Sequence, residues 1–252
     1  MKKSLWTGLS VLLFAAVPTW AATGKMVSYR SGDETVSSYL SLPAGAGKHP
    51  ALVVVHEWWG LNDWVRAKTD RFARDGYVSL AIDLYRGRSA GTDPDLAHQL
   101  MRGLPEDRAA RDLQAAFDFL AARNDVEASR IGSIGWCMGG GYSLALAIEE
   151  PRLAACVINY GRLVTDPKTI AAIHAPLLGN FGAEDQGIPP SSVEAFEKAA
   201  RAEGKTVDFK VYPGAGHGFA SNPDPKIYRP TAARDADARV DKFFAQYLKS
   251  NS

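Results

Sequence analysis

A single cysteine lies between glycines in the segment 135–140, which reads Gly-Trp-Cys-Met-Gly-Gly. This is the pattern of a sharp turn from a strand into a helix, with cysteine at the nucleophile position where serine is usual. Side chains two residues before or after the nucleophile would collide in such a turn, so Gly135 and Gly139 fit it. A helix N-terminus also favours an anion such as a thiolate. The pattern predicts that Cys137 is a nucleophile, with a buried cysteine in a tight turn as the alternative.

Two later glycine-rich loops carry the groups that could activate this thiol, an acidic pair at Glu184 and Asp185 and a histidine at His217. A histidine can take the thiol proton, and a carboxylate can fix the tautomer of its ring. The chain order nucleophile, acid, histidine is that of the α/β-hydrolase fold. We favour Asp185 as the acid because its shorter side chain suits a loop that turns again at Pro189. Glu184 remains the alternative.

The segment 56–60 reads His-Glu-Trp-Trp-Gly and follows an apolar stretch. It differs from the zinc motif H-E-x-x-H at position 60 and follows a strand, so we expect no metal there. In the fold named above, this loop supplies one oxyanion-hole amide and the residue after the nucleophile supplies the other. We therefore assign the amides of Trp58 and Met138. Glu57 would lie near Cys137, where it could accept the thiol proton or be kept near-neutral by burial; a solvated loop carboxylate is the alternative.

Strands and helices alternate along the chain, and the strands are apolar. This order predicts an α/β protein with a mostly parallel central sheet, helices on both faces and working residues after the carboxyl ends of strands. The first two strands are expected to form an antiparallel edge. We predict strands at 27–30, 35–42, 51–56, 77–82, 131–135, 154–160, 176–181 and 206–212, and helices at 64–74, 105–122, 138–149, 191–202 and 231–248.

The chain has 252 residues, of which 46% are hydrophobic, and a formal net charge of +1. This balance argues against a nucleic-acid-binding surface. Two cysteines exclude a disulfide scaffold and a zinc site built from several thiolates. Cys156 lies in an apolar run and is expected to be an inert core residue. We expect residues 22–252 to form one domain that acts as a monomer.

The first 21 residues have the pattern of a secretory signal peptide. Lys2 and Lys3 precede an apolar run at 9–17 that is too short to span a bilayer, and Thr19-Trp20-Ala21 places small residues before a cleavage point. Cleavage there would leave a soluble protein exported to the periplasm or beyond, without a membrane segment. An uncleaved anchor is the alternative.

Together these motifs resemble those of the dienelactone hydrolase family, the carboxymethylenebutenolidases of the α/β-hydrolase fold, over nearly all of the mature chain. The resemblance implies that Cys137, Asp185 and His217 form the catalytic triad. It also implies that Glu57 contacts the thiol and helps to activate it when substrate binds. The segments that carry it are 56–62, 83–85, 135–140, 159–161, 182–189 and 217–219.

The resemblance also implies a carboxylate clamp of two arginines, which this chain matches only in part. One arginine follows Asp-Leu-Tyr, where the chain offers Arg86 or Arg88; the other lies four residues past the histidine, where the chain has Ser221. We expect Tyr85, Arg86 and Trp136 to bind substrate. The alternatives are a solvated arginine and ordinary core packing of the tryptophan.

The sequence therefore predicts a hydrolase of a lactone or small carboxylic ester, acting through a Cys-His-Asp triad and an acyl-enzyme, without cofactor or metal. A broad-specificity exported esterase or thioesterase is one alternative. The other is a binding or redox-sensing protein that keeps the fold without turnover.

Overall fold

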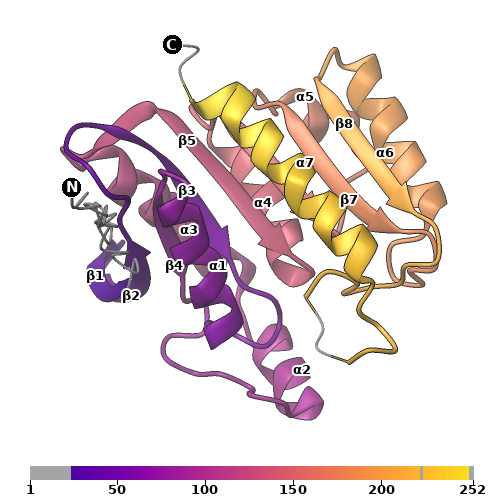
Figure 1. Ribbon diagram of the computed structural model, residues 1–252, viewed down its shortest axis with the longest axis horizontal. Helices are drawn as coiled ribbons and strands as arrows, with labels where there is room; N and C mark the ends of the chain where they lie inside the picture. The colour runs from indigo at the N-terminus through magenta and orange to yellow at the C-terminus, as the bar shows by residue number, and fades with distance from the viewer. Residues whose placement is uncertain (1–23, 222–223, 250–252) are drawn as a thin grey trace, which may run out of the picture.

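A computed structural model describes residues 24–221 and 224–249, so the predicted signal peptide lies outside the described residues. The described strands form one sheet in the order β1-β2-β4-β3-β5-β6-β7-β8 (Figure 1). The strands are β1 (Lys25–Ser31), β2 (Glu34–Ser41), β3 (His49–Val55), β4 (Val78–Ile82), β5 (Val126–Trp136), β6 (Ala155–Asn159), β7 (Leu177–Gly182) and β8 (Val207–Tyr212). The helices are α1 (Asp63–Arg74), α2 (Pro94–Arg102), α3 (Glu106–Ala121), α4 (Met138–Glu149), α5 (Pro167–Ala171), α6 (Pro190–Ala202) and α7 (Pro230–Leu248).

The sheet has one antiparallel edge and is otherwise parallel. β1 pairs with β2, and β2 with β4, in antiparallel register. Each remaining pair, from β4–β3 to β7–β8, is parallel. The predicted fold class and its antiparallel edge are therefore confirmed.

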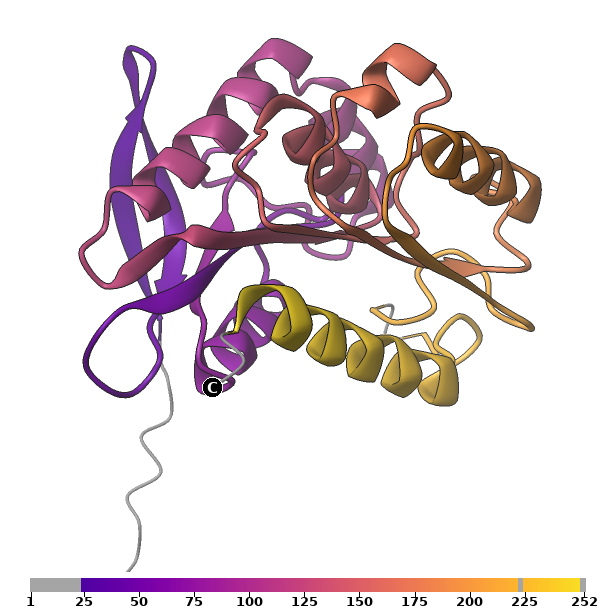
Figure 2. The ribbon, with the colours of Figure 1, turned by 90° about the horizontal axis from the view of Figure 1, so that it is seen from above.

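Helices cover both faces of the sheet (Figure 2). α1 and α7 lie on one face, where Phe72 and Phe244 pack against the apolar strand residues. α3, α4, α5 and α6 lie on the other face, where Phe117 and Phe196 belong to a second core cluster. Burial on both faces explains why the central strands consist almost entirely of apolar residues. Within the described ranges, no helix is long and apolar enough to cross a membrane.

Two helices were absent from the sequence prediction, although the sequence carries a start signal for each. Asp93 caps α2 by accepting hydrogen bonds from the amides of Asp95 and Leu96, and Pro94 occupies the first turn. Asp166 caps α5 by accepting a hydrogen bond from the amide of Thr169, and Pro167 occupies the first turn. Both helices are short, with nine and five residues, so an apolar pattern spans few turns in them and the cap signal tells more.

Candidate active site

The turn around Cys137 joins the end of β5 to the start of α4 with backbone angles of φ 54° and ψ −120°. A non-glycine residue with positive φ is strained, and such strain clusters at functional sites. A Cβ atom added to Gly135 would lie 2.0 Å from the carbonyl oxygen of Gly139, and one added to Gly139 would lie 2.3 Å from that of Val55. The backbones approach so closely that only glycine fits at either position.

The structure brings Cys137, His217 and Asp185 into one line of hydrogen bonds. His217 Nε2 lies 3.0 Å from Cys137 Sγ, and His217 Nδ1 lies 2.7 Å from Asp185 Oδ2. The other Asp185 oxygen accepts from the amides of Gly187 and Ile188, each at 2.9 Å. Asp185 is buried whereas Glu184 is exposed, so Asp185 is the acid that faces the histidine.

Asp185 and Cys137 both raise the pKa of the His217 ring. Burial alone would lower its pKa, but the hydrogen bond that the ring donates to Asp185 and the adjacent sulfur of Cys137 raise the pKa of His217 to about 10. Burial would raise the pKa of Asp185, yet the hydrogen bonds from His217 and from the amide of Ile188 lower it overall. The raised pKa of His217 and the lowered pKa of Asp185 therefore favour a protonated ring beside an ionised acid at neutral pH.

Two backbone amides, one directly after Cys137 and one in the loop after β3, have no acceptor within the part of the chain that the structure describes. Among the described residues, no protein acceptor pairs with the N–H groups of Trp58 or Met138. Met138 is the first residue of α4, where the helix itself offers its N–H no partner. The contact of Gly139 with the end of β3 places the two segments side by side. Two free backbone N–H groups on adjacent segments are what an oxyanion hole is built from.

Glu57 is almost completely buried, and its carboxylate is bound by Ser221 rather than by the thiol. Ser221 Oγ donates to Glu57 Oε1 at 2.7 Å, and the hydroxyl of Tyr160 donates to Ser221 Oγ at 3.0 Å. Burial raises the pKa of Glu57 to about 7, although Ser221 and His217 lower it. Burial therefore keeps the neutral form of this carboxyl group populated well above the ordinary pKa of a glutamate.

This raised pKa predicts a specific pH dependence of stability. Between pH 4.5, the ordinary pKa, and about 7, the folded state binds more protons at Glu57 than the unfolded state does. Glu57 therefore stabilises the folded state most at low pH. The unfolding free energy falls by about 3 kcal/mol as the pH rises through this window.

Glu57→Gln removes the titration and keeps the hydrogen-bonding shape. We expect the unfolding free energy of the variant, minus that of the wild type, to rise by about 3 kcal/mol between pH 4.5 and pH 8. Denaturant unfolding at a series of pH values measures this difference, and the contribution of His217 cancels in it. A difference that stays constant with pH would show that Glu57 titrates normally.

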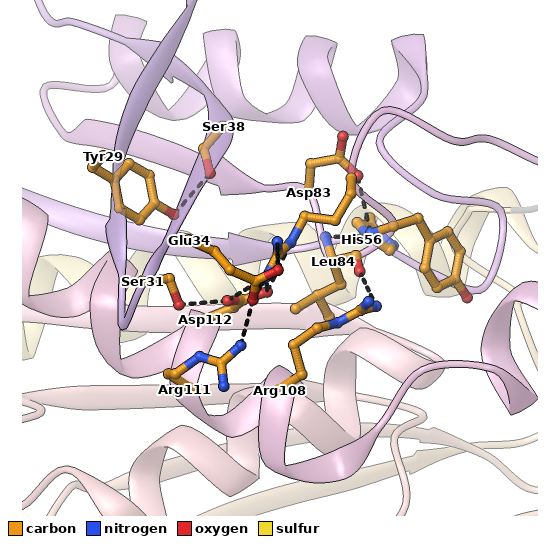
Figure 3. Close-up of polar contacts among 12 residues, drawn as sticks. Tyr29, Ser31, Glu34, Ser38, His56, Asp83, Leu84, Arg108, Arg111 and Asp112 are labelled. Atoms are coloured by element: carbon orange, nitrogen blue, oxygen red, sulfur yellow. Dashed lines mark hydrogen bonds and ion pairs between the residues drawn. The ribbon is translucent and has the colours of Figure 1, made fainter.

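The structure does not place Arg86 at the thiol, which corrects the expectation that it binds substrate. Its guanidinium lies 2.8 Å from Asp112 and 3.1 Å from Glu34. Figure 3 shows these two carboxylates, with Arg111 and Ser31 bound to the same pair. Because Asp112 is buried, its charge needs a cation and hydrogen bonds, and Arg86 supplies them.

We therefore expect Arg86→Ala to affect stability and not substrate choice. Removing one partner of a buried ion pair costs about 3 kcal/mol, which denaturant unfolding will detect. The ratio of KM values for a carboxylate-bearing ester and a neutral ester of similar size should stay within about twofold. Arg88→Ala is the control, because Arg88 is exposed and should leave both quantities unchanged. If Arg86→Ala raised KM for the anionic ester alone, this would show that Arg86 binds the substrate carboxylate.

The other two residues expected to bind substrate differ in their placement. Trp136 is 2% exposed and packs edge-on against Trp64 at 5.0 Å, so it is a core residue and not a wall of the site. Tyr85 is also buried, and its hydroxyl lies 3.3 Å from Met138 Sδ, directly beside the turn. Half-buried Trp58 contacts exposed His98 of α2, with ring centroids 4.7 Å apart.

The sequence analysis assigned no role to three residues around the triad, although it quoted their segments or positions. Tyr160 and Ser221 bind Glu57 in series, and His56 contacts the Glu57 backbone. Tyr160 follows the end of β6 and could have been found by its position at a strand end. Ser221 was singled out only as the residue where the resemblance implies an arginine, because its contact with Glu57 depends on how its loop lies against the end of β3.

A sequence model described as the dienelactone hydrolase family matches residues 36–248. The chain belongs to this family. It is 35% identical over 228 residues to a "Putative carboxymethylenebutenolidase" of Methylorubrum extorquens, covering 85% of this chain and 78% of the relative. A relative with the same description in Salmonella typhimurium is 33% identical over 244 residues, covering 91% and 90%.

Comparison with a solved structure indicates the same family. The crystal structure of a "Putative Dienelactone Hydrolase" from Klebsiella pneumoniae superposes with a TM-score of 0.81 at 31% identity, covering 89% of this chain and 98% of the other. Membership in the dienelactone hydrolase family confirms the resemblance that the sequence motifs indicated. The protein is thus a carboxylic-ester hydrolase of the carboxymethylenebutenolidase type.

Proposed function

We propose that this hydrolase cleaves a lactone or small carboxylic ester with Cys137 as its nucleophile. The observation that carries the proposal is the continuous line from Cys137 Sγ to His217 and Asp185, at 3.0 and 2.7 Å. The thiolate attacks the ester carbonyl carbon, and the carbonyl oxygen becomes an oxyanion held by the amides of Trp58 and Met138. His217 then donates its proton to the leaving alcohol oxygen as the C–O bond breaks, which leaves a thioester on Cys137.

The second half of the cycle hydrolyses this thioester. The His217 ring, now neutral, takes a proton from a water molecule as the water attacks the acyl carbon. The same two amides stabilise the second oxyanion. Its collapse breaks the C–S bond and releases the acid, after which the thiolate and the protonated ring are restored. For a lactone, the alcohol and the acid leave as one molecule.

We further propose that the substrate needs no carboxylate. Arg86 is held by Asp112 and Glu34, and the hydroxyl of Ser221 contacts Glu57 at the position where the family resemblance implies an arginine. An additional anion beside the buried Glu57 carboxyl would be unfavourable unless a cation were supplied. These contacts favour neutral esters and lactones.

Trapping the acyl-enzyme tests the proposal directly. Rapid mixing with a chromogenic short-chain ester should release about one equivalent of alcohol in a burst, followed by slower turnover. Acid quenching should preserve an acyl mass increase on the peptide that contains Cys137. Turnover without any acyl mass on this cysteine would assign the reaction to another group.

We also propose that residues 1–21 direct export and are removed, leaving the enzyme as a monomer outside the cytoplasm. The charged start, the short apolar run and the small residues before Ala22 support this. Among the described residues both cysteines are free thiols. N-terminal sequencing of protein from the host's periplasmic fraction should read from Ala22, and an intact Met1 there would contradict the proposal.

A further inference from the structure

His56 is completely buried beside the candidate active site, yet the reaction described above moves no proton to or from it. Both of its ring nitrogens are engaged: Nδ1 lies 2.6 Å from the carbonyl oxygen of Glu57, and Nε2 lies 3.2 Å from the amide nitrogen of Leu84. A backbone N–H can only donate, so Nε2 accepts and Nδ1 carries the proton. The ring is thus a neutral imidazole in one tautomer, and burial lowers its pKa accordingly.

The carbonyl that His56 binds belongs to the same peptide unit as one amide of the oxyanion hole. A trans peptide is planar, so the C=O of Glu57 and the N–H of Trp58 point in opposite directions. The carbonyl also accepts from the amide of Gly60 at 3.1 Å. The Trp58 N–H has no acceptor among the described residues. Because the two groups point in opposite directions, hydrogen bonds that hold the Glu57 carbonyl also fix the direction of the Trp58 N–H.

The ring is itself anchored to the scaffold. Leu84 follows β4; its N–H donates to His56, and its carbonyl accepts from Arg108 of α3 at 3.1 Å (Figure 3). Tyr85 packs against the His56 ring with centroids 4.9 Å apart, and its hydroxyl reaches the Met138 side chain. A chain of contacts thus runs from α3 through His56 to the peptide that precedes Trp58.

We propose that His56 is a positioning residue for the oxyanion hole: its Nδ1–H fixes the Glu57–Trp58 peptide so that the Trp58 amide faces the oxygen that becomes negative. This inference rests on the proposed ester hydrolysis. Its effect is confined to the transition state, because the amide binds the oxyanion more strongly than the ground-state carbonyl. A histidine that only filled space would affect stability instead.

His56→Phe keeps a ring in the same space and removes both hydrogen bonds. We expect kcat to fall about 10- to 100-fold with KM changed by less than about threefold, since loss of an oxyanion donor costs about 10²–10³ and the Gly60 contact still holds the peptide in part. His56→Gln offers one N–H and one carbonyl oxygen and should recover most of the rate. His49→Phe, at the opposite end of β3, is the matched control and should leave kcat unchanged.

The rate ratio between an ester and its thionoester gives a readout that a merely structural role would not move. Sulfur is the weaker acceptor, so the oxyanion amides favour the oxygen ester. His56→Phe should therefore lower this ratio about tenfold, while His56→Gln and His49→Phe keep the wild-type ratio. Because a ratio of two rates does not depend on the folded fraction, partial misfolding cannot imitate the effect. If the phenylalanine variant does not fold, His56→Met takes its place.

The outcomes separate this inference from the proposed function. A wild-type ratio in the His56 variants that lack a donor, or an equal fall in kcat for His49→Phe, would overturn the positioning role and leave ester hydrolysis intact. No hydrolysis of any ester by the wild type would overturn the proposed function itself.

Discussion

Cys137→Ala should reduce kcat for a short-chain ester by at least about 10⁴-fold while the protein remains folded. Cys137 is the proposed nucleophile in the line Cys137–His217–Asp185, and loss of a nucleophile costs several powers of ten in comparable triads. The side chain is small and partly exposed, so its removal should lower the unfolding free energy by less than about 1 kcal/mol. Initial rates and denaturant unfolding measure both effects.

Two variants make this prediction specific. Cys137→Ser should also be poor, because a site arranged for a thiolate does not activate a hydroxyl equally well. Cys156→Ala is the control for loss of a thiol: Cys156 is buried in β6, and burial raises the pKa of its thiol to about 11. It should keep full activity with only a modest loss of stability. Substantial turnover by Cys137→Ala would place the nucleophile elsewhere.

The parts of the site that the sequence predicted are those fixed by short-range geometry. The turn around Cys137 depends on glycines two residues away on either side, and these are visible in the sequence. The positions of Asp185 and His217 follow from strand order, since parallel strands deliver their carboxyl ends to one edge of the sheet. The same reasoning predicts that the amides of Trp58 and Met138 face the thiol.

The parts that it did not predict depend on long-range partners. The direction of Arg86 is decided by Asp112, a buried carboxylate on α3 that the sequence presents as one more polar residue of an amphipathic helix. Trp136 directly precedes the cysteine, yet its side chain is buried in the core against Trp64 of α1. Ser221 meets Glu57 only because the loop after β8 folds back over the end of β3.

Gly135→Ala should abolish activity through the backbone alone. Its new Cβ would lie 2.0 Å from the carbonyl oxygen and 2.8 Å from the amide nitrogen of neighbouring turn residues, and backbone atoms cannot move aside as a flexible side chain can. Either the end of β5 or the start of α4 must shift. We expect the unfolding free energy to fall by about 3 kcal/mol. A displacement of about 1 Å between Cys137 and His217 would lower kcat by at least about 10²-fold.

Gly141→Ala, two residues further into the same helix than Gly139, isolates the cause. A Cβ there would meet its nearest neighbour, Arg162, at 3.5 Å, which is ordinary contact. Because alanine favours a helix over glycine by about 1 kcal/mol, this variant should be as stable as the wild type or more so, with unchanged kcat. The two variants add the same methyl group six residues apart, so a large loss in one and none in the other assigns the effect to the tight turn. Equal behaviour of both in unfolding and rate measurements would show that this turn relaxes more easily than its close backbone contacts indicate.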